Sequence, residues 1–380
     1  MEIESTTRQK LDRAGIKEFV RKEIIPFADL YDREERTPRE LIQKMARQGF
    51  LGALLSAEWG GSGMDMVSLG SLHEEIGYGC SSARSLLTVH SMVSYAILKW
   101  GSRYQKAQWL PGLASGECIG AFALSEPGVG SDARSVETSA TLQDNHYVLR
   151  GRKKWISYGQ IADLFLVFAQ VNGKVSVFLV ERDAPGLSIL PITGMLGTRA
   201  SMLAELHLED CTVPKESLVG GIGFGLAPIG TSALDIGRYS VACGCVGIAQ
   251  ACLDATLSFT SSRKQYGTLL KEHQLIQQMV TDMITNVRAA RLLCHHAGTL
   301  KDEGDPASLM ETFIAKYFAS TSAMKAASDT VQIHGALGCS SEYPVQRYWR
   351  DARVMEIIEG STQIQQITIA SYGYQQNECP

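Results

Sequence analysis

One glutamate near the carboxyl-terminal end of the sequence has surroundings that suit a general base. Glu359 follows Ile357 and Ile358 and precedes Gly360. A carboxylate between apolar neighbours is expected to be partly desolvated, which raises its pKa toward the range useful to a base near neutral pH. Gly360 lets a substrate approach the backbone closely. Taken alone, a glutamate in this place is more often a helix cap or half of an ion pair, so its role depends on the other segments.

Two further segments combine residues that suit a flat ligand. AFALSEPGVGSD at 121–132 begins like a strand and enters a glycine-rich loop, whose backbone amides can approach a ligand and whose Ser125 and Ser131 add hydroxyl groups. In GRKKWIS at 151–157, Trp155 could cover one face of a planar ring while Ser157 donates a hydrogen bond to it. The alternatives are an ordinary turn for the first segment and a core tryptophan for the second.

A third segment suits a phosphate and an aromatic base. Arg263 and Tyr266 lie in RKQYG, which is followed by EHQ at 272–274, at a corner between two expected helices. A solvated basic turn is the alternative. GGIGFG at 220–225 is not a G-x-G-x-x-G loop of a strand–helix unit, and no G-x-x-x-x-G-K-[ST] occurs. We interpret 220–225 as a linker between domains.

Three regions of different periodicity must position these residues. Residues 1–117 show helical spacing of apolar residues in IKEFVRKEIIPFADLYDREE and LIQKMARQGFLGALL, with a helix start at 37–40. Residues 118–222 contain short runs rich in valine, leucine and aromatics, separated by Asp-Asn, Asn-Gly and Pro-Gly turns, which predict a β-sandwich or barrel. Residues 223–380 return to long helical segments rich in small residues, which favour a four-helix bundle. The expected fold class is α+β.

Composition excludes several classes of function. The 380 residues carry a net charge of −4, and aromatic residues do not alternate with basic runs, so no nucleic-acid partner is expected. Nine cysteines without regular spacing argue against a disulfide framework, and no cluster has metal-ligand spacing, so no metal is expected. MEIESTTRQKLDRAG lacks the apolar core of a signal peptide, and no uninterrupted run of about 18 apolar residues predicts a membrane span. A cytoplasmic location is the default expectation.

Together these segments resemble the acyl-CoA dehydrogenase family. S-E-P-G-x-G-S-D, K-x-W-I-S, R-x-x-x-G with a following H-Q, V-Q-I-x-G and R-D-A-x-x-x-x-I-x-E-G occur in order, and the resemblance runs from Leu11 to about Ile369. It implies an α-helical N-terminal domain (1–117), a middle β-barrel (118–222) and a C-terminal four-helix bundle (223–380). It also implies that FAD binds between these domains.

The resemblance assigns cofactor positions residue by residue. The flavin ring is expected to lie against Phe122, Leu124, Ser125, Trp155 and Ser157, and Ser131 to lie near the phosphopantetheine or the flavin diphosphate. The positions that hold the diphosphate and adenosine of FAD are matched by Arg263, Tyr266, His273 and Gln274, and further FAD contacts by Gln332, Gly335, Ser361 and Gln363. In the family some of these residues, Gln332 and Gly335 among them, come from a neighbouring subunit, so a homodimer or homotetramer is expected.

The resemblance also narrows the choice of base. Family members place it either after the R-D-A helix or just before the arginine of an L-D-x-x-R helix, and here the second position is Gly237, which cannot act. Glu359 therefore inherits the role, with Ile358 in place of the usual aromatic neighbour and Arg238 near the thioester arm. The implied reaction removes the α-proton and transfers the β-hydride to the flavin.

One arginine points to a polar substrate. Arg84 and Thr88 lie in GCSSARSLLT, on the helix that lines the acyl end of the pocket with neutral or apolar groups in fatty-acyl members. A buried guanidinium needs either a protein carboxylate or an oxygen of the substrate. The patterns S-S-x-R-S, G-C-V-G-I and M-E-I-I-E-G-S look most like dehydrogenases that act on short polar acyl groups held by an acyl carrier protein, in hydroxymalonyl- or methoxymalonyl-type extender-unit biosynthesis.

Three other functions compete with this interpretation. One is an ordinary short-chain acyl-CoA dehydrogenase of catabolism, which would hand electrons to an electron-transfer flavoprotein. Another is a flavin monooxygenase or nitroalkane-type oxidase on the same fold, with oxygen as acceptor; Glu359 counts against a monooxygenase, because monooxygenases lack this base. The last is a non-catalytic scaffold, which would be colourless when purified.

Overall fold

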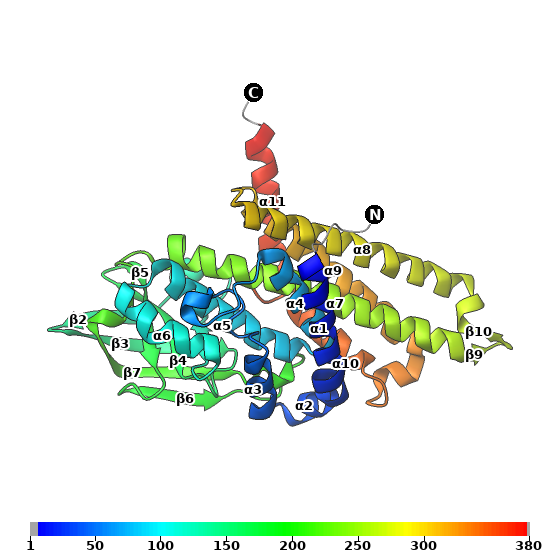
Figure 1. Ribbon diagram of the computed structural model, residues 1–380, viewed down its shortest axis with the longest axis horizontal. Coiled ribbons are helices and arrows are strands. Elements are labelled where there is room, and N and C mark those ends of the chain that lie inside the picture. Colours follow the sequence, from blue (N-terminus) through cyan, green and yellow to red (C-terminus); the bar gives the residue numbers. More distant parts are fainter. Residues whose placement is uncertain (1–6, 378–380) are drawn as a thin grey trace.

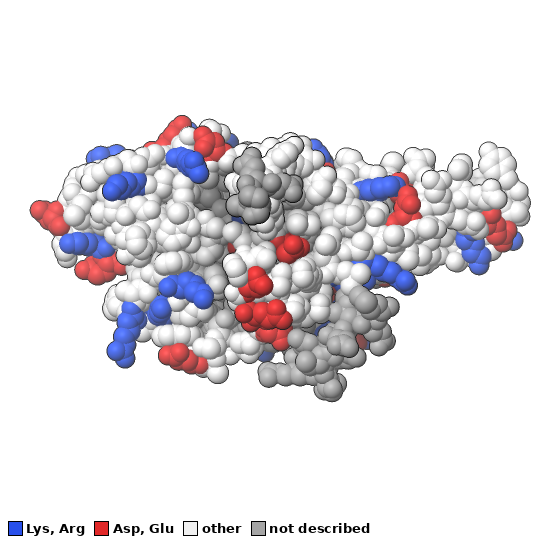
Figure 2. All heavy atoms as spheres, turned by 90° about the horizontal axis from the view of Figure 1, so that it is seen from above, with Lys and Arg blue, Asp and Glu red and all other residues white. Residues whose placement is uncertain are grey.

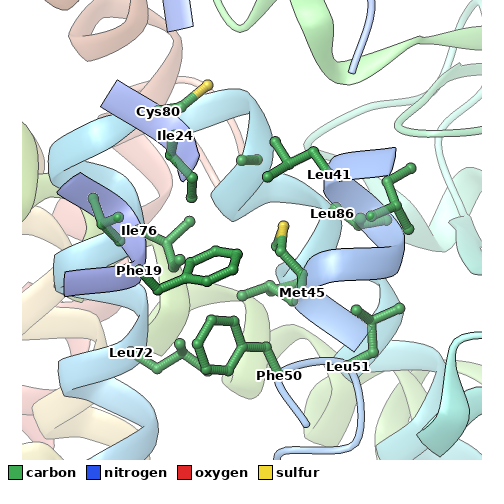
Figure 3. Packing of buried hydrophobic residues seen from close by; sticks show 14 of the residues in the cluster. Phe19, Ile24, Leu41, Met45, Phe50, Leu51, Leu72, Ile76, Cys80 and Leu86 are labelled. Carbon is green, nitrogen blue, oxygen red and sulfur yellow. The ribbon is translucent and has the colours of Figure 1, made fainter. Parts of the chain in front are cut away.

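The computed structural model describes residues 7–377, and Figure 1 shows a mainly β unit at one end of an elongated helical body. The N-terminal third is helical, as the sequence predicts. Its helices are α1 (Thr7–Phe19), α2 (Ala28–Glu34), α3 (Arg39–Arg47), α4 (Met66–Gly79), α5 (Ser81–Trp100) and α6 (Arg103–Ser115). The apolar faces of α1 to α5 meet in one cluster, in which the rings of Phe19 and Phe50 pack edge to face with centroids 5.3 Å apart (Figure 3).

Two expected helices of this region are shorter than their apolar spacing suggests. The helical path from α1 is interrupted before α2, because Pro26 cannot donate a backbone hydrogen bond inside a helix. The helix expected through residue 55 ends at Arg47, and Gly49 follows with φ +75°. Gly52 then lies so close to the backbone of Gly61 and Ala114 that a methyl group there would be 3.0–3.2 Å from those atoms. This close packing of chain segments ends the helix and cannot be read from local sequence.

The middle region is one twisted sheet. Its strands are β1 (Gly120–Ala123), β2 (Ser139–Gln143), β3 (His146–Ile156), β4 (Leu164–Val171), β5 (Lys174–Glu181), β6 (Leu187–Pro191), β7 (Ala204–Pro214) and β8 (Leu218–Val219). They run in the order β6-β7-β3-β2-β4-β5-β8, with β1 parallel to β4. Asn172 and Gly173, both at positive φ, form the tight β4–β5 turn that the Asn-Gly signal predicts. The pairing of β2 with β4 is a single residue pair, Ser139 with Gln170, so a narrow seam joins β6-β7-β3-β2 to β4-β5-β8.

The C-terminal region is built around three long helices, α7 (Thr231–Ser262), α8 (Gln274–Glu303) and α9 (Ser308–His334). The short hairpin of β9 (Lys264–Gln265) and β10 (Thr268–Leu269) joins α7 to α8 at the end of the molecule farthest from the sheet (Figure 1). The fourth expected helix is divided into α10 (Val345–Met355) and α11 (Thr362–Asn377). The turn between them contains Glu359.

Helix α7 is unusually apolar. Together with the π-helical segment Gly225–Gly230 before it, α7 is long and apolar enough to cross a bilayer by length and composition alone, although it contains no uninterrupted run of about 18 apolar residues. Within the protein, 78% of its most apolar stretch is buried, because α4, α5, α8 and α9 all pack against it. Helix α7 is therefore apolar because it lies in the core of the protein. Figure 2 shows basic and acidic residues interspersed on one face of the molecule, rather than a field of one sign.

Candidate active site

The candidate base lies in a tight turn at the boundary of two helices. Glu359 has φ +54° and Gly360 has φ +89°, so both residues are in the left-handed region, which is uncommon for glutamate. Gln365 donates from Nε2 to the carbonyl oxygens of Glu359 (3.2 Å) and Gly360 (3.0 Å), and Arg238 donates from Nε to the Glu359 carbonyl (3.2 Å). Lys316 donates to the Gly360 carbonyl at 2.7 Å. Side chains of α7, α9 and α11 therefore fix this backbone.

The carboxylate of Glu359 has the environment expected of a base. Its Oε2 is buried and has no hydrogen-bond partner among the described residues. Burial raises the pKa of Glu359, and the positive charges of Arg238, Arg84 and Lys316 partly oppose this rise. A methyl group added at Gly237 would lie 2.5 Å from this Oε2. Gly237, the alternative base position, thus leaves the space that the Glu359 carboxylate fills.

Arg84 is fully buried on α5 and pairs only with neutral groups. Nη1 donates to the hydroxyls of Thr88 (2.7 Å) and Ser240 (3.2 Å), and Nη2 contacts the sulfur of Met355 at 3.4 Å. Within residues 7–377 no carboxylate forms an ion pair with it, and its Nε lacks an acceptor. Burial lowers the pKa of Arg84, and the negative groups that oppose this fall, Cys245, Glu359 and Asp351, form no hydrogen-bonded ion pair with it.

A chain of polar groups extends behind Arg84. The hydroxyls of Thr88 and Ser240 are 2.6 Å apart, and Ser240 Oγ lies 3.1 Å from His73 Nδ1. Burial lowers the pKa of His73 to about 3, so the ring is neutral and adds no positive charge. Gly244 on α7 makes room for the arginine, because a methyl group there would be 2.3 Å from Arg84 Cδ. The sequence reasoning found Arg84 and Thr88 but missed Ser240 and His73, which come from other helices.

The expected flavin platform is assembled at adjoining strand ends. Lys154 N donates to the Ser125 carbonyl at 2.9 Å, which holds the segment after β1 beside the end of β3. Trp155 has φ +65° and an indole that is 47% exposed, so it is a surface platform rather than a core residue. Leu124 is buried beneath this corner, and Phe122 packs on Phe168 with ring centroids 5.0 Å apart.

A buried ion pair that sequence reasoning missed holds this platform together. Lys153 Nζ donates to Glu126 Oε1 at 2.6 Å and to the Leu124 carbonyl at 3.1 Å, and both charged side chains are inaccessible to solvent. Glu126 also accepts hydrogen bonds from the amides of Glu137 and Thr138. The pair therefore ties the SEPGVGSD loop to β3.

These residues fit one face of a flavin. Trp155 offers a flat, accessible indole, and the hydroxyls of Ser125, Ser131 and Ser157 have no side-chain hydrogen bond in the described part of the chain. A methyl group at Gly130 would meet nothing within 4 Å, so the loop is open to a ligand there. FAD would be held here by stacking on the indole and by hydroxyl and amide donors.

The remaining cofactor positions lie elsewhere in the chain. Arg263, Gln274, Gln332 and Gly335 are exposed, and Tyr266 is 96% exposed. His273 accepts or donates one hydrogen bond with Thr268 (3.1 Å), and both lie near the hairpin at the far end of α7 (Figure 1). Phe259 stacks on His334 at that same end, which places Gln332 and Gly335 there too. Within one chain, these expected contacts to the diphosphate and adenosine of FAD therefore do not lie beside Trp155.

Two of the expected FAD contacts, Ser361 and Gln363, lie next to Glu359. Ser361 Oγ accepts a hydrogen bond from the Ile364 amide at 3.4 Å at the start of α11, and Gln363 is exposed beside it. Ile358 is half-buried against the C-terminal core. The guanidinium of Arg238 lies over the ring of Phe313 at 4.5 Å, in addition to its bond to the Glu359 carbonyl.

Fold and site together define a flavin-dependent oxidoreductase that acts on acyl thioesters. The N-terminal, middle and C-terminal domains of acyl-CoA dehydrogenases match residues 6–117, 121–211 and 223–373. The chain belongs to the acyl-CoA dehydrogenase family, whose members use FAD.

Three relatives illustrate the range of the similarity. The mitochondrial short-chain specific acyl-CoA dehydrogenase of Rattus norvegicus is 38% identical over 97% of this chain and 91% of its own length. A glutaryl-coenzyme A dehydrogenase solved with glutaryl-CoA is 36% identical, with a TM-score of 0.93 over 97% of this chain and 96% of that one. FkbI, which serves biosynthesis of the methoxymalonyl extender unit of the polyketide Fk520, is 31% identical, with a TM-score of 0.87 over 96% and 99% of the two chains.

Proposed function

We propose that this enzyme oxidises a short acyl thioester whose acyl group ends in an oxygen-bearing, polar group, and that Glu359 removes the α-proton. The observation that carries this proposal is the buried guanidinium of Arg84, which has hydroxyl partners but no carboxylate among the described residues. A fatty acyl chain would leave this charge uncompensated, whereas a carboxylate, hydroxyl or carbonyl oxygen would accept its hydrogen bonds.

The mechanism follows from the surroundings of Glu359. Its Oε2 has no hydrogen-bond partner among the described residues, so it keeps a free lone pair with which to take the α-proton of a thioester bound beside it. Its raised pKa makes it a stronger base than a solvated glutamate, and the nearby cations limit that rise. FAD bound at this site would supply the acceptor for the β-hydride. Trp155 and the 124–126 segment would hold the flavin and cover one of its faces.

We also propose that the thioester is tethered to an acyl carrier protein. The likeness to FkbI supports this, because that enzyme serves the biosynthesis of an extender unit. The buried Arg84 supports it as well, because a short acyl precursor of such a unit, with a hydroxyl on a hydrogen-bearing β-carbon, offers the guanidinium an oxygen and still has a β-hydride to lose. A second candidate is a short-chain acyl-CoA dehydrogenase, which the 38% identity with the rat enzyme favours.

Anaerobic bleaching of the flavin by a panel of thioesters separates these candidates. The panel pairs butyryl and glutaryl groups with short hydroxylated acyl groups that keep hydrogen on the β-carbon, such as 2,3-dihydroxypropionyl, each on CoA and on a carrier protein. We expect polar acyl groups to reduce the flavin faster than butyryl, and the carrier-linked form faster than the CoA-linked form. If butyryl-CoA is the fastest of all, the enzyme is an ordinary short-chain dehydrogenase and Arg84 is structural.

A further inference from the structure

Lys316 is a buried cation directed at the turn that carries the candidate base. It lies on α9, its side chain is fully buried, and its Nζ donates to the Gly360 carbonyl at 2.7 Å. No other acceptor of this ammonium group, and no ion-pair partner, occurs in the stretch from residue 7 to residue 377. A buried ammonium without a salt bridge is costly, so its position calls for an explanation.

The negative groups around Lys316 point to the base. Burial lowers the pKa of Lys316 to about 8, while Cys245, Glu359 and Glu356 act to raise it. The lysine is therefore still charged at neutral pH. Of these neighbours, the Cys245 thiol is buried with a pKa raised to about 12 and stays neutral, and Glu356 forms its own ion pair with Arg353. Glu359 is left as the carboxylate whose charge Lys316 balances.

The backbone contact has a geometric consequence. Glu359 and Gly360 are both held at positive φ, a conformation that costs free energy for a glutamate. Lys316 and Gln365 together hold the Gly360 carbonyl, and Arg238 and Gln365 hold that of Glu359. Without Lys316 the turn loses its only charged donor to Gly360, and the carboxylate is free to move away from Gly237.

We propose that Lys316 is a positioning residue, which fixes the Glu359–Gly360 turn and stabilises the ionised form of the Glu359 carboxylate. This inference rests on the proposed role of Glu359 as base. The other charged groups that face this carboxylate are Arg84 from α5 and Arg238 from α7. Arg84 is assigned to substrate and Arg238 donates to the Glu359 carbonyl, whereas Lys316 is the cation that holds the Gly360 carbonyl.

The test is a direct titration of Glu359 in the FAD-loaded protein. The infrared band of its protonated carboxyl is identified by its absence in Glu359→Gln, and its pH midpoint is compared in wild type, Lys316→Met and Lys316→Gln. A positive charge favours the carboxylate, so removing it must raise the midpoint. Glutamine can still donate to Gly360, so a shift in both variants isolates the charge.

The matched control is Lys325→Met, on the same helix but 50% exposed and paired with Asp329 and Asp282. We expect it to leave the midpoint unchanged. Unchanged midpoints in both Lys316 variants would overturn the proposal, and so would loss of the native fold in both, which is the result of a purely structural lysine. The base assignment fails separately, if Glu359→Gln reduces flavin as fast as wild type.

Discussion

The Glu359 carboxylate occupies the space that a side chain at position 237 would need. The sequence predicts a desolvated glutamate, and the structure shows why the desolvation is tolerated: three cations lie around the carboxylate, and a glycine faces it. A side chain at position 237 would collide with the carboxylate, so a base at one position excludes a base at the other. The identity of residue 237 therefore predicts which position holds the base.

Replacing Glu359 by glutamine removes basicity and keeps shape. We expect Glu359→Gln to retain FAD but to reduce it at least about a hundredfold more slowly, the low end of general-base contributions. Because burial raises the pKa of Glu359, the wild-type rate should rise with pH to a midpoint above that of an ordinary glutamate. Rapid-mixing absorbance measures both effects. Glu356→Gln, in the same turn, is the control, and a wild-type rate in Glu359→Gln would place the base elsewhere.

Arg84 should decide which acyl groups react. We expect Arg84→Leu to lower kcat/KM for the best polar thioester, because the substrate oxygen loses a buried charged partner. The corresponding rise in activation free energy should be about 2–5 kcal/mol. The same change should improve turnover of butyryl thioesters, since it removes an uncompensated charge from the pocket. The ratio of the two kcat/KM values is the measurement. A variant that slows both substrates equally would show that Arg84 serves the fold and not selectivity.

Among the secondary-structure elements, the end of β3 shows how far sequence reasoning reaches. Trp155 and Ser157 were found because an aromatic ring and a hydroxyl at a strand end suit a planar ligand, and the exposed indole agrees with that use. The ion pair between Lys153 and Glu126 was missed, because nothing local marks a lysine in a strand as buried. Its partner lies 27 positions away and meets it only when the sheet forms.

That ion pair should control both stability and cofactor retention. Lys153→Met leaves the buried Glu126 carboxylate without a counter-ion, so we expect a loss of about 3–5 kcal/mol in the free energy of unfolding, with partial loss of FAD. Adding Glu126→Gln should restore much of the stability, because no charge then remains buried. Chemical denaturation and the flavin content of the purified protein give the two readings.

The control for this change lies on the same strand. Arg150 forms an exposed ion pair with Asp210, and Arg150→Met should cost less than about 1 kcal/mol. If Lys153→Met and Arg150→Met behave alike, the buried pair does not organise the loop.

At the scale of the whole molecule, two groups of cofactor positions lie at opposite ends of one chain, with Ser361 and Gln363 beside the base. The platform around Trp155 belongs to the sheet, and Arg263 and Tyr266 belong to the hairpin beyond α7 (Figure 1). The family motifs predict both groups, but only the fold shows that a single chain keeps them apart. A guanidinium that is exposed in one chain can still bind a phosphate if a second chain supplies the flavin platform.

Mixing two defective variants tests whether the site is shared. Arg263→Ala and Trp155→Ala should each lose FAD when purified alone, whereas the neighbouring Lys264→Ala should keep it. If Arg263 acts on the partner's cofactor, unfolding and refolding an equal mixture gives hybrid dimers in which one site has both wild-type residues. Flavin binding should then return to about a quarter of the sites. A site contained in one chain would regain nothing on mixing, and a monomer that binds FAD tightly would refute the shared arrangement outright.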